Sequence, residues 1–265
     1  MLREGLRSAR RGLAWWSLGL VGLVALMVSV YPSIRDNPDM KRLVEEYPDA
    51  LKAFMAFGGE VEYGTAAGYL GSELYAFMVP ILLLVAAIGA AARSIAGEEE
   101  RGTLDLLLAN PVSRRRVALE KLATVAVNVV ALGAVLWAAL AVGTTAASMD
   151  VGLGRLAAAT TAAVLLALVF AAVAFLLGAA TGKRGKAVAV ASALAVLTYV
   201  LNALSSLVDF LEPARWVSPF FHYAAGDPLR NGLSLWHALV LAGIALVAAA
   251  LALPAFERRD LTSAA

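Results

Sequence analysis

Residues 156–182 read LAAATTAAVLLALVFAAVAFLLGAATG, a run of 27 residues without a charged side chain. A helix rises about 1.5 Å per residue, so about 20 apolar residues cross the hydrocarbon core of a bilayer. The run is long enough for this, and its alanines and leucines are strong helix formers. It therefore predicts a transmembrane helix.

Five further charge-free runs accompany it, in a chain of 265 residues that is 61% hydrophobic with a mean hydropathy of +0.77. They cover residues 12–34, 74–92, 122–149, 187–208 and 231–256. Barrel strands alternate in polarity over about ten residues, whereas these runs are continuously apolar. The sequence thus predicts an all-α polytopic membrane protein with six transmembrane helices, folded as one domain over residues 1–265, and excludes a soluble globule.

The distribution of Lys and Arg predicts the orientation of these spans. Of the 22 basic residues, 15 lie in the arm before the first span, in 93–121, in 183–186 and in the tail. The opposite side carries seven basic and twelve acidic residues. Basic loops stay in the cytoplasm, so we expect both termini to be cytoplasmic and the protein to lie in the plasma membrane.

Two connections on the predicted outer side are longer than turns. Segment 35–73 contains an apolar stripe at helical spacing, which predicts an amphipathic helix on the membrane surface or across the spans. A role in gating or substrate release is the alternative. Segment 209–230 is aromatic and broken by prolines, and it either lies at the interface or dips back into the protein. The stripe of the first segment consists of Met40, Leu43, Val44, Tyr47, Leu51, Phe54 and Met55.

The most polar stretch, 97–122, carries ten charges between the second and third predicted spans. Each charge at mid-bilayer would cost about 2.5–3.5 kcal/mol, so the stretch must lie in water. Thr103 suits the N-cap of a short helix, which Asn110 and Pro111 end, and Ser113 suits the cap of the next helix. The leucines of the short helix fall on one face: Leu104, Leu107 and Leu108.

Such a short helix is too small to be stable alone. Burying each leucine is worth roughly 1.5–3 kcal/mol, which favours docking onto another surface. That surface is either the lipid headgroups or a cytosolic partner. The acidic triplet 98–100 disfavours anionic headgroups, which attract only the arginines at 114–116.

The stretch IAGEEERGTLDLLLANPVSRRRVALEKL at 95–122, the six-span plan and the terminal FERRDL at 256–261 together resemble type-2 ABC exporter permeases, the membrane-spanning subunits of ATP-binding cassette transporters. The resemblance covers nearly the whole chain and is most specific over 96–121. It implies an exporter permease that pairs with a second permease copy, in a homodimer or a heterodimer, and binds two copies of a separate ABC ATPase. It also implies an amphipathic connecting helix over residues 1–12 at the cytoplasmic surface.

The same resemblance implies that the helix around 98–109, within the loop 93–121, is a coupling helix seated in a cleft of the ATPase. The residues assigned to coupling are Glu98, Glu99, Glu100, Arg101, Gly102, Thr103, Leu104, Asp105, Leu107 and Leu108.

No nucleotide site is expected in this chain. A P-loop needs two glycines with four residues between them, followed by Lys and Ser or Thr, to cradle phosphates. The nearest string, GAATGKR at 178–184, is one residue short and ends in arginine. ATP and Mg are therefore expected on the partner ATPase, with no cofactor in this chain. Membrane lipid is an expected partner, and nucleic acid is not.

Other classes are less favoured by the sequence. An intramembrane enzyme needs a motif such as HExxH or GxSxG, and the sequence contains neither. His222 and His237 are the only histidines and lack further ligands at metal spacing, so we expect them at the outer interface and no metal site. A membrane scaffold or receptor that docks a cytosolic protein remains the alternative function.

A substrate path is predicted near the outer end of the fifth span, at Asn202, Ser205 and Ser206, where polar side chains gather in an apolar run. No charged residue is expected within any span. Charged groups inside membranes mark proton relays and voltage sensors, so their absence favours a hydrophobic or amphiphilic substrate.

Overall fold

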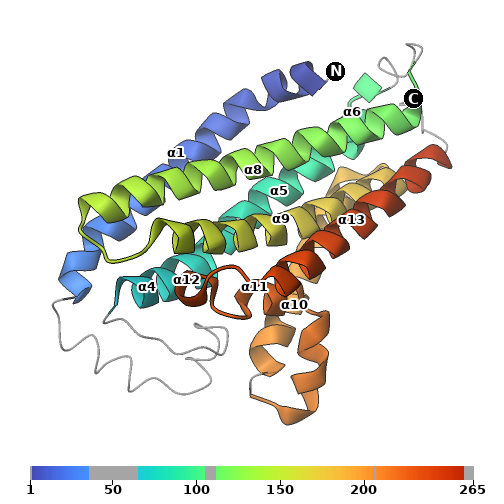
Figure 1. The fold of residues 1–265 in the computed structure, drawn as a ribbon. Coiled ribbons are helices and arrows are strands. Elements are labelled where there is room, and N and C mark those ends of the chain that lie inside the picture. The colour runs from blue at the N-terminus through green and yellow to red at the C-terminus, as the bar shows by residue number, and fades with distance from the viewer. Residues whose placement is uncertain (1, 36–64, 105–111, 206, 260–265) are drawn as a thin grey trace.

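The computed structural model describes residues 2–35, 65–104, 112–205 and 207–259 (Figure 1). Within these ranges six helices are long and apolar enough to cross a membrane, which confirms the predicted all-α fold with six spans. They run side by side in an elongated bundle. The spans are α1 (Leu2–Arg35), the continuous helix α4, η1 and α5 (Ala66–Tyr69, Leu70–Met78 and Val79–Ser94), α8 (Arg114–Ala146), α9 (Leu153–Thr181), α10 (Arg184–Ser205) and α13 (Leu235–Glu257).

Four shorter elements lie between the spans. They are α6 (Ala96–Glu99), the 3-10 helix η2 (Asp209–Val217), α11 (Pro219–Ala224) and α12 (Pro228–Asn231). In Figure 1, α6 lies at the end of the bundle where α1 starts and α13 finishes, while α11 and α12 lie toward the opposite end. With an even number of spans, the first starts and the last finishes at the same end of the bundle, because each crossing reverses the direction of the chain.

Two span boundaries differ from those predicted. The second helix begins at Ala66 instead of residue 74, so it contains Glu73, contrary to the expectation that the spans carry no charge. The third begins at Arg114, where the Ser113 hydroxyl accepts a hydrogen bond from the backbone N–H of Arg116 at 3.3 Å. Ser113 is thus the predicted N-cap, and its helix starts eight residues before the charge-free run at 122.

Two predicted amphipathic segments have different outcomes. The connecting segment 1–12 is, from Leu2 onward, continuous with the first span in the single helix α1. The predicted outer helix, with its stripe over 40–55, lies outside the described residues. The domain assignment to residues 1–265 remains a prediction.

Helix α9 lies at the centre of the bundle. Two thirds (67%) of its most apolar window is buried, against 11% for α1. It packs against α5, α8, α10 and α13, and α1 instead packs mainly against α8. A helix that is apolar on all sides is normally an interior helix, and small side chains let neighbouring backbones approach. The buried small residues on α9 include Ala158, Ala159, Ala162, Ala163, Ala167, Ala171, Ala174 and Gly178.

The contact between α8 and α9 depends on a glycine. A Cβ added at Gly133 of α8 would overlap the Cγ2 atom of Val164 on α9. A second glycine, Gly143, faces α1, where an added Cβ would lie 3.0 Å from Val28 Cγ2. Both faces of α8 are therefore packed closely enough that a single methyl group matters.

The second half of the outer segment 209–230 packs back among the helices. Phe220 of α11 is buried, with its ring centroid 5.8 Å from that of Phe170 and 5.4 Å from that of Tyr199. The buried Ser218 donates a hydrogen bond to the Thr198 carbonyl at 2.8 Å. By contrast η2 has no buried residue, and its Phe210 is 88% exposed. The segment is thus divided into an exposed half and a half that enters the protein.

Gly133→Ala should destabilise the purified protein in detergent by about 1–3 kcal/mol, because the extra methyl overpacks the contact between α8 and α9. Thermal unfolding followed by circular dichroism measures this effect. The double variant Gly133→Ala/Val164→Ala should recover most of the loss, since it removes the overlapping methyl groups. Gly19→Ala on α1, where nothing lies within 4 Å of an added Cβ, is the matched control. Wild-type stability of Gly133→Ala would contradict the packing described.

Candidate functional site

The acidic triplet predicted for coupling is bonded to residues at or near one end of three other helices. Glu98 forms an ion pair with Lys121 on α8. The Glu100 carboxylate accepts a hydrogen bond at 2.8 Å from the backbone N–H of Arg184, the first residue of α10. Glu99 forms an ion pair with Arg259, just beyond α13. We name these residues the glutamate clasp: Glu98, Glu99, Glu100, Lys121, Arg184 and Arg259.

The pair of Glu99 and Arg259 is the most buried part of the clasp. The Glu99 side chain is 5% exposed and that of Arg259 is 16% exposed. Beside them Gly182 ends α9 in the left-handed region, with φ of +65°. A Cβ at this position would overlap Arg259 Nη1 and lie 2.8 Å from Glu99 Oε1. Glycine is therefore required here both by the backbone conformation and by the space that the ion pair occupies.

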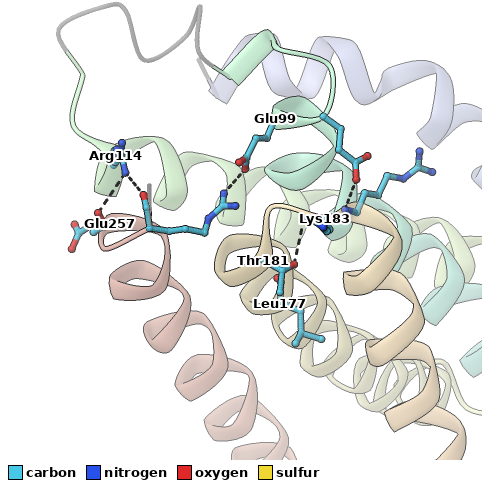
Figure 2. A network of polar contacts seen from close by, with 9 residues as sticks. Glu99, Arg114, Leu177, Thr181, Lys183 and Glu257 are labelled. Atoms are coloured by element: carbon cyan, nitrogen blue, oxygen red, sulfur yellow. Dashed lines mark hydrogen bonds and ion pairs between the residues drawn. The ribbon is translucent and has the colours of Figure 1, made fainter. Parts of the chain in front are cut away.

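A second connection joins the start of α8 to the end of α13. Figure 2 shows Arg114 directed at the chain around Glu257, where its Nη1 donates to the Arg259 carbonyl at 2.7 Å and to the Glu257 carbonyl at 3.5 Å. Arginine at the C-terminus of a helix also interacts favourably with the helix dipole. The first arginine of the basic triplet is thus hydrogen-bonded to another segment of the same chain. Arg116 forms a pair with Glu120 at 3.1 Å along α8.

The described residues after α6 turn back toward the bundle. Gly102 has a φ of +70°, and the Thr103 hydroxyl donates to the Glu98 carbonyl at 3.0 Å. The Arg101 Nε donates to the Gly97 carbonyl at 2.8 Å. Leu104 is 0% exposed and belongs to the core. It is therefore not available for docking, and the remaining predicted residues of the helix, Asp105, Leu107 and Leu108, lie outside the described residues.

Glu99→Gln should lower the thermal stability of the purified protein more than Glu120→Gln does. The first change leaves the largely buried Arg259 without its counter-charge, at a cost of about 3 kcal/mol, whereas an exposed i,i+4 pair contributes less than about 0.5 kcal/mol. The charge-swapped variant Glu99→Arg/Arg259→Glu should recover part of the loss. Equal stability of the two single variants would show that Arg259 does not depend on Glu99.

At the opposite end of the bundle, the second span contains a π-helix, Leu70–Met78. Its wider turn leaves the Tyr75 carbonyl without a backbone hydrogen-bond donor. In this register the Val79 N–H bonds the Leu74 carbonyl, five residues earlier. The next residue is Pro80, which has no N–H to give to Tyr75. The Tyr223 hydroxyl of α11 instead donates to the Tyr75 carbonyl at 2.6 Å.

This contact extends into α9. The Tyr75 hydroxyl lies 2.7 Å from the Thr160 hydroxyl and donates to the Leu156 carbonyl at 3.5 Å. Burial raises the pKa of Tyr223 well above its ordinary value, so this hydroxyl remains a donor. The two tyrosines therefore connect the second span, α9 and α11. π-Helical turns are frequent at functional sites.

A cavity of about 150 Å³ lies beside this contact, between the second span and the segment α11–α12. Small side chains of the second span form one wall, and both tyrosines line it. Asp227 and Arg230, an ion pair at 3.3 Å, are among the polar lining residues. The lining is thus mostly apolar with a few charged groups.

Tyr223→Phe should destabilise the protein by about 1–3 kcal/mol, because it leaves the buried Tyr75 carbonyl without a donor. In a Pro80→Ala background the same change should cost less, since the substituted residue supplies the missing backbone N–H. Chemical unfolding of the four proteins in a double-mutant cycle measures the difference. Additive effects would mean that Pro80 is not the reason the carbonyl needs Tyr223.

The predicted substrate-path residues are only partly described. Asn202 is 3% exposed, and its Nδ2 atom has no hydrogen-bond partner among the described residues. The Ser205 hydroxyl donates to the Asn202 carbonyl at 2.7 Å. Ser206 lies outside the described residues. The two described side chains share one turn of α10, and their role in the path remains a prediction.

Several residues of these sites give no local signal in the sequence. Lys121, Gly182 and Arg259 acquire their roles only through contacts with the triplet, across sequence separations of 23 to 160 residues. The terminal FERRDL includes Arg259 and contributes to the family resemblance, but without a role assigned to this arginine. At the tyrosine contact, Pro80 five residues after Tyr75 marks a missing backbone donor in the sequence.

Six apolar helices with polar contacts at both ends of the bundle define an α-helical membrane protein whose loops are bonded to its helix ends. The family model described as multidrug efflux system permease Rv1217c, C-terminal domain, matches residues 5–257, and the chain belongs to this family. A search of curated proteins finds no match. The chain is thus a permease of an efflux transporter, which confirms the broader part of the predicted function.

Proposed function

We propose that the chain is the permease subunit of a type-2 ABC exporter, in which a separate ATPase binds ATP and Mg and drives a substrate outward. Two permease copies, in a homodimer, and two ATPase copies form the complete transporter. The observation that carries this proposal is the glutamate clasp. It bonds the base of the polar loop to the ends of α8, α10 and α13, so a force on the loop acts on three spans together.

The loop is also joined directly to the second and third spans. α6 follows α5 after the single residue Ile95, which is 1% exposed, and α8 begins at Arg114. An ATPase that binds the loop through the helix around 98–109 would therefore move α5 and α8 through the backbone. It would move α10 and α13 through Glu100 and Glu99. This is the arrangement needed to convert ATP-driven closure of two ATPases into tilting of the spans.

The orientation proposed for the protein follows from the same end of the bundle. The short helix α6, which carries Glu98 and Glu99, lies there with the start of α1 and the finish of α13 (Figure 1). Basic residues also concentrate at this end, among them Arg93, Lys183 and Lys186. By the positive-inside rule this is the cytoplasmic side of the plasma membrane, where ATP is available.

The substrate proposed for this permease is hydrophobic or amphiphilic. The spans carry few charged groups, and the buried amide of Asn202 beside Ser205 offers weak polar contacts near the outer end of α10. Exposed apolar side chains on the outer surfaces of α1, α10 and α13 contact membrane lipid or the second permease copy.

Leu107→Glu should leave the protein in the membrane but reduce both co-purification with its ABC ATPase and permease-stimulated ATP hydrolysis by about tenfold or more. A charge replaces an apolar side chain on the proposed docking face, and central apolar contacts dominate such interfaces. Reversing the charges of Glu98–Glu100 is a poorer test, because it also breaks the glutamate clasp.

Asn110→Ala, in the same loop but off the leucine stripe, is the matched control and should retain coupling. Thermal stability of both variants in detergent separates docking from folding. Wild-type coupling by Leu107→Glu, or ATP hydrolysis by the purified permease alone, would refute the proposal.

A further inference from the structure

The two histidines of the chain meet at the end of the bundle opposite α6. His222 of α11 is 5% exposed, and its Nδ1 lies 2.9 Å from the Nδ1 of His237 in the first turn of α13. The other nitrogen of His222, Nε2, lies 3.0 Å from the carbonyl oxygen of Trp216. Both contacts have hydrogen-bond lengths, and together they determine where the protons are.

A carbonyl oxygen only accepts, so the Nε2 of His222 must carry a hydrogen. A neutral imidazole has a single N–H, which makes the Nδ1 of His222 an acceptor. The hydrogen between the two rings therefore belongs to the Nδ1 of His237. In the neutral pair the Nε2 of His237 is left without a hydrogen, and His237 is only partly buried. The first added proton binds there without disturbing either hydrogen bond.

The second proton has no such place. The remaining basic nitrogen is the Nδ1 of His222, which already accepts from His237. Protonating it would set two N–H groups and two positive charges against each other across 2.9 Å. The rings must then separate, because neither can accept a hydrogen bond from the other. The pair thus accommodates no added proton or one added proton, but not two.

The geometry points to a proton-binding clamp, in which His222 and His237 hold α11 against α13 while the pair carries at most one added proton, and release it when a second proton binds. The histidine pair takes no part in the proposed coupling to an ATPase, and the clamp does not depend on that coupling. In the proposed orientation it faces the exterior, so external acid would open it.

The charged groups around the pair do not stabilise its doubly protonated state. Arg215 of η2 lies over the Phe221 ring, 5.1 Å from its centroid, and pairs with Glu212 at 3.3 Å. Asp227 pairs with Arg230 of α12 at 3.3 Å. Both carboxylates are therefore already engaged by arginines. The other titratable or charged groups on α11 and on the elements packed against it, within the described residues, are Asp209 on η2, Arg155 on α9, Tyr199, Arg184 and Lys186 on α10, Glu257 on α13 and Tyr223 on α11.

Release of α11 would also affect a hydrogen bond of the second span. Tyr223 follows His222 directly on α11 and supplies the hydrogen bond to the Tyr75 carbonyl of the π-helix. A small apolar space beside the histidines is closed on the α9 side by Ala162, which is 2% exposed. Movement of α11 away from α13 should therefore both loosen the Tyr75 contact and expose Ala162.

The first test reads the two rings directly. Because the chain has only two histidines, protein labelled with ¹⁵N-histidine and purified without a histidine tag shows only four ring nitrogens. In nanodiscs near pH 8, His222 should be protonated on Nε2 and His237 on Nδ1. Acidification should give two steps, separated by more than about tenfold in proton concentration. Two independent titrations within that range, or Nε2–H on both neutral rings, would overturn the assignment.

The second test asks whether the clamp opens. The chain has no cysteine, so Ala162→Cys and, separately, the exposed Leu235→Cys each provide a single thiol. The modification rate at position 162, divided by that at 235, cancels the pH dependence of thiol reactivity and should rise at least tenfold across the second step. In His237→Asn the side chain binds no proton, and its amide can donate to neutral His222 or, turned over, accept from protonated His222, so in this background the ratio should stay constant. A constant ratio in the unsubstituted background would refute opening even if the rings titrate as a pair.

Discussion

The structure depends on one packing constraint, that α9 is surrounded by other helices on all sides. Lipid tails are as apolar as leucine, so burying apolar surface gives little drive for helices to associate inside a membrane. Close van der Waals contact must supply the stability instead. The alanines along α9 and glycines such as Gly133 on its neighbour α8 allow that approach. Charged side chains are consequently confined to the ends of α9, and the polar contacts of the protein form at the two ends of the bundle.

Two helices that pack on α9 are connected to each other at both ends. The second span and α13 are joined at one end by Glu99 and Arg259. At the other end Tyr75 is joined to Tyr223 of α11, and the neighbouring His222 is joined to His237 of α13. These contacts connect the second span to α13 at both ends of the bundle, outside its apolar interior.

The sequence was sufficient to predict the six spans, since length and apolarity are local properties that the bilayer selects directly. The cap at Ser113 was also predictable, since capping depends on residues that are neighbours in the sequence. The partners of Glu98, Glu99 and Glu100 were not, because an acidic triplet has the same pattern whether it faces water or a distant helix end. The stripe of leucines likewise shows that a helix has an apolar face without showing what covers it, and Leu104 is covered by the chain itself.

The π-helix and the histidine pair illustrate a second limit. Pro80 marks a carbonyl without a donor, but only the folded chain shows that Tyr223 supplies one. His222 and His237 lie 15 positions apart on two helices with the short helix α12 between them, so no periodicity relates them. Tyr223 replaces the missing amide donor, and His237 provides the hydrogen-bond partner of His222. In both cases the partner belongs to another element. Local rules of sequence interpretation fail at such positions, and these are often the places where function resides.

The distribution of polar groups also limits how the spans can move. Rearranging the apolar interior would open gaps that cost packing energy, whereas some ion pairs of the protein are partly exposed to solvent. Lys121 and Glu98, for example, have side chains 21% and 27% exposed, so water or a bound protein can replace either partner. Contacts can therefore be exchanged at low cost at Glu98, whereas breaking the buried pair of Glu99 and Arg259 would cost several times more.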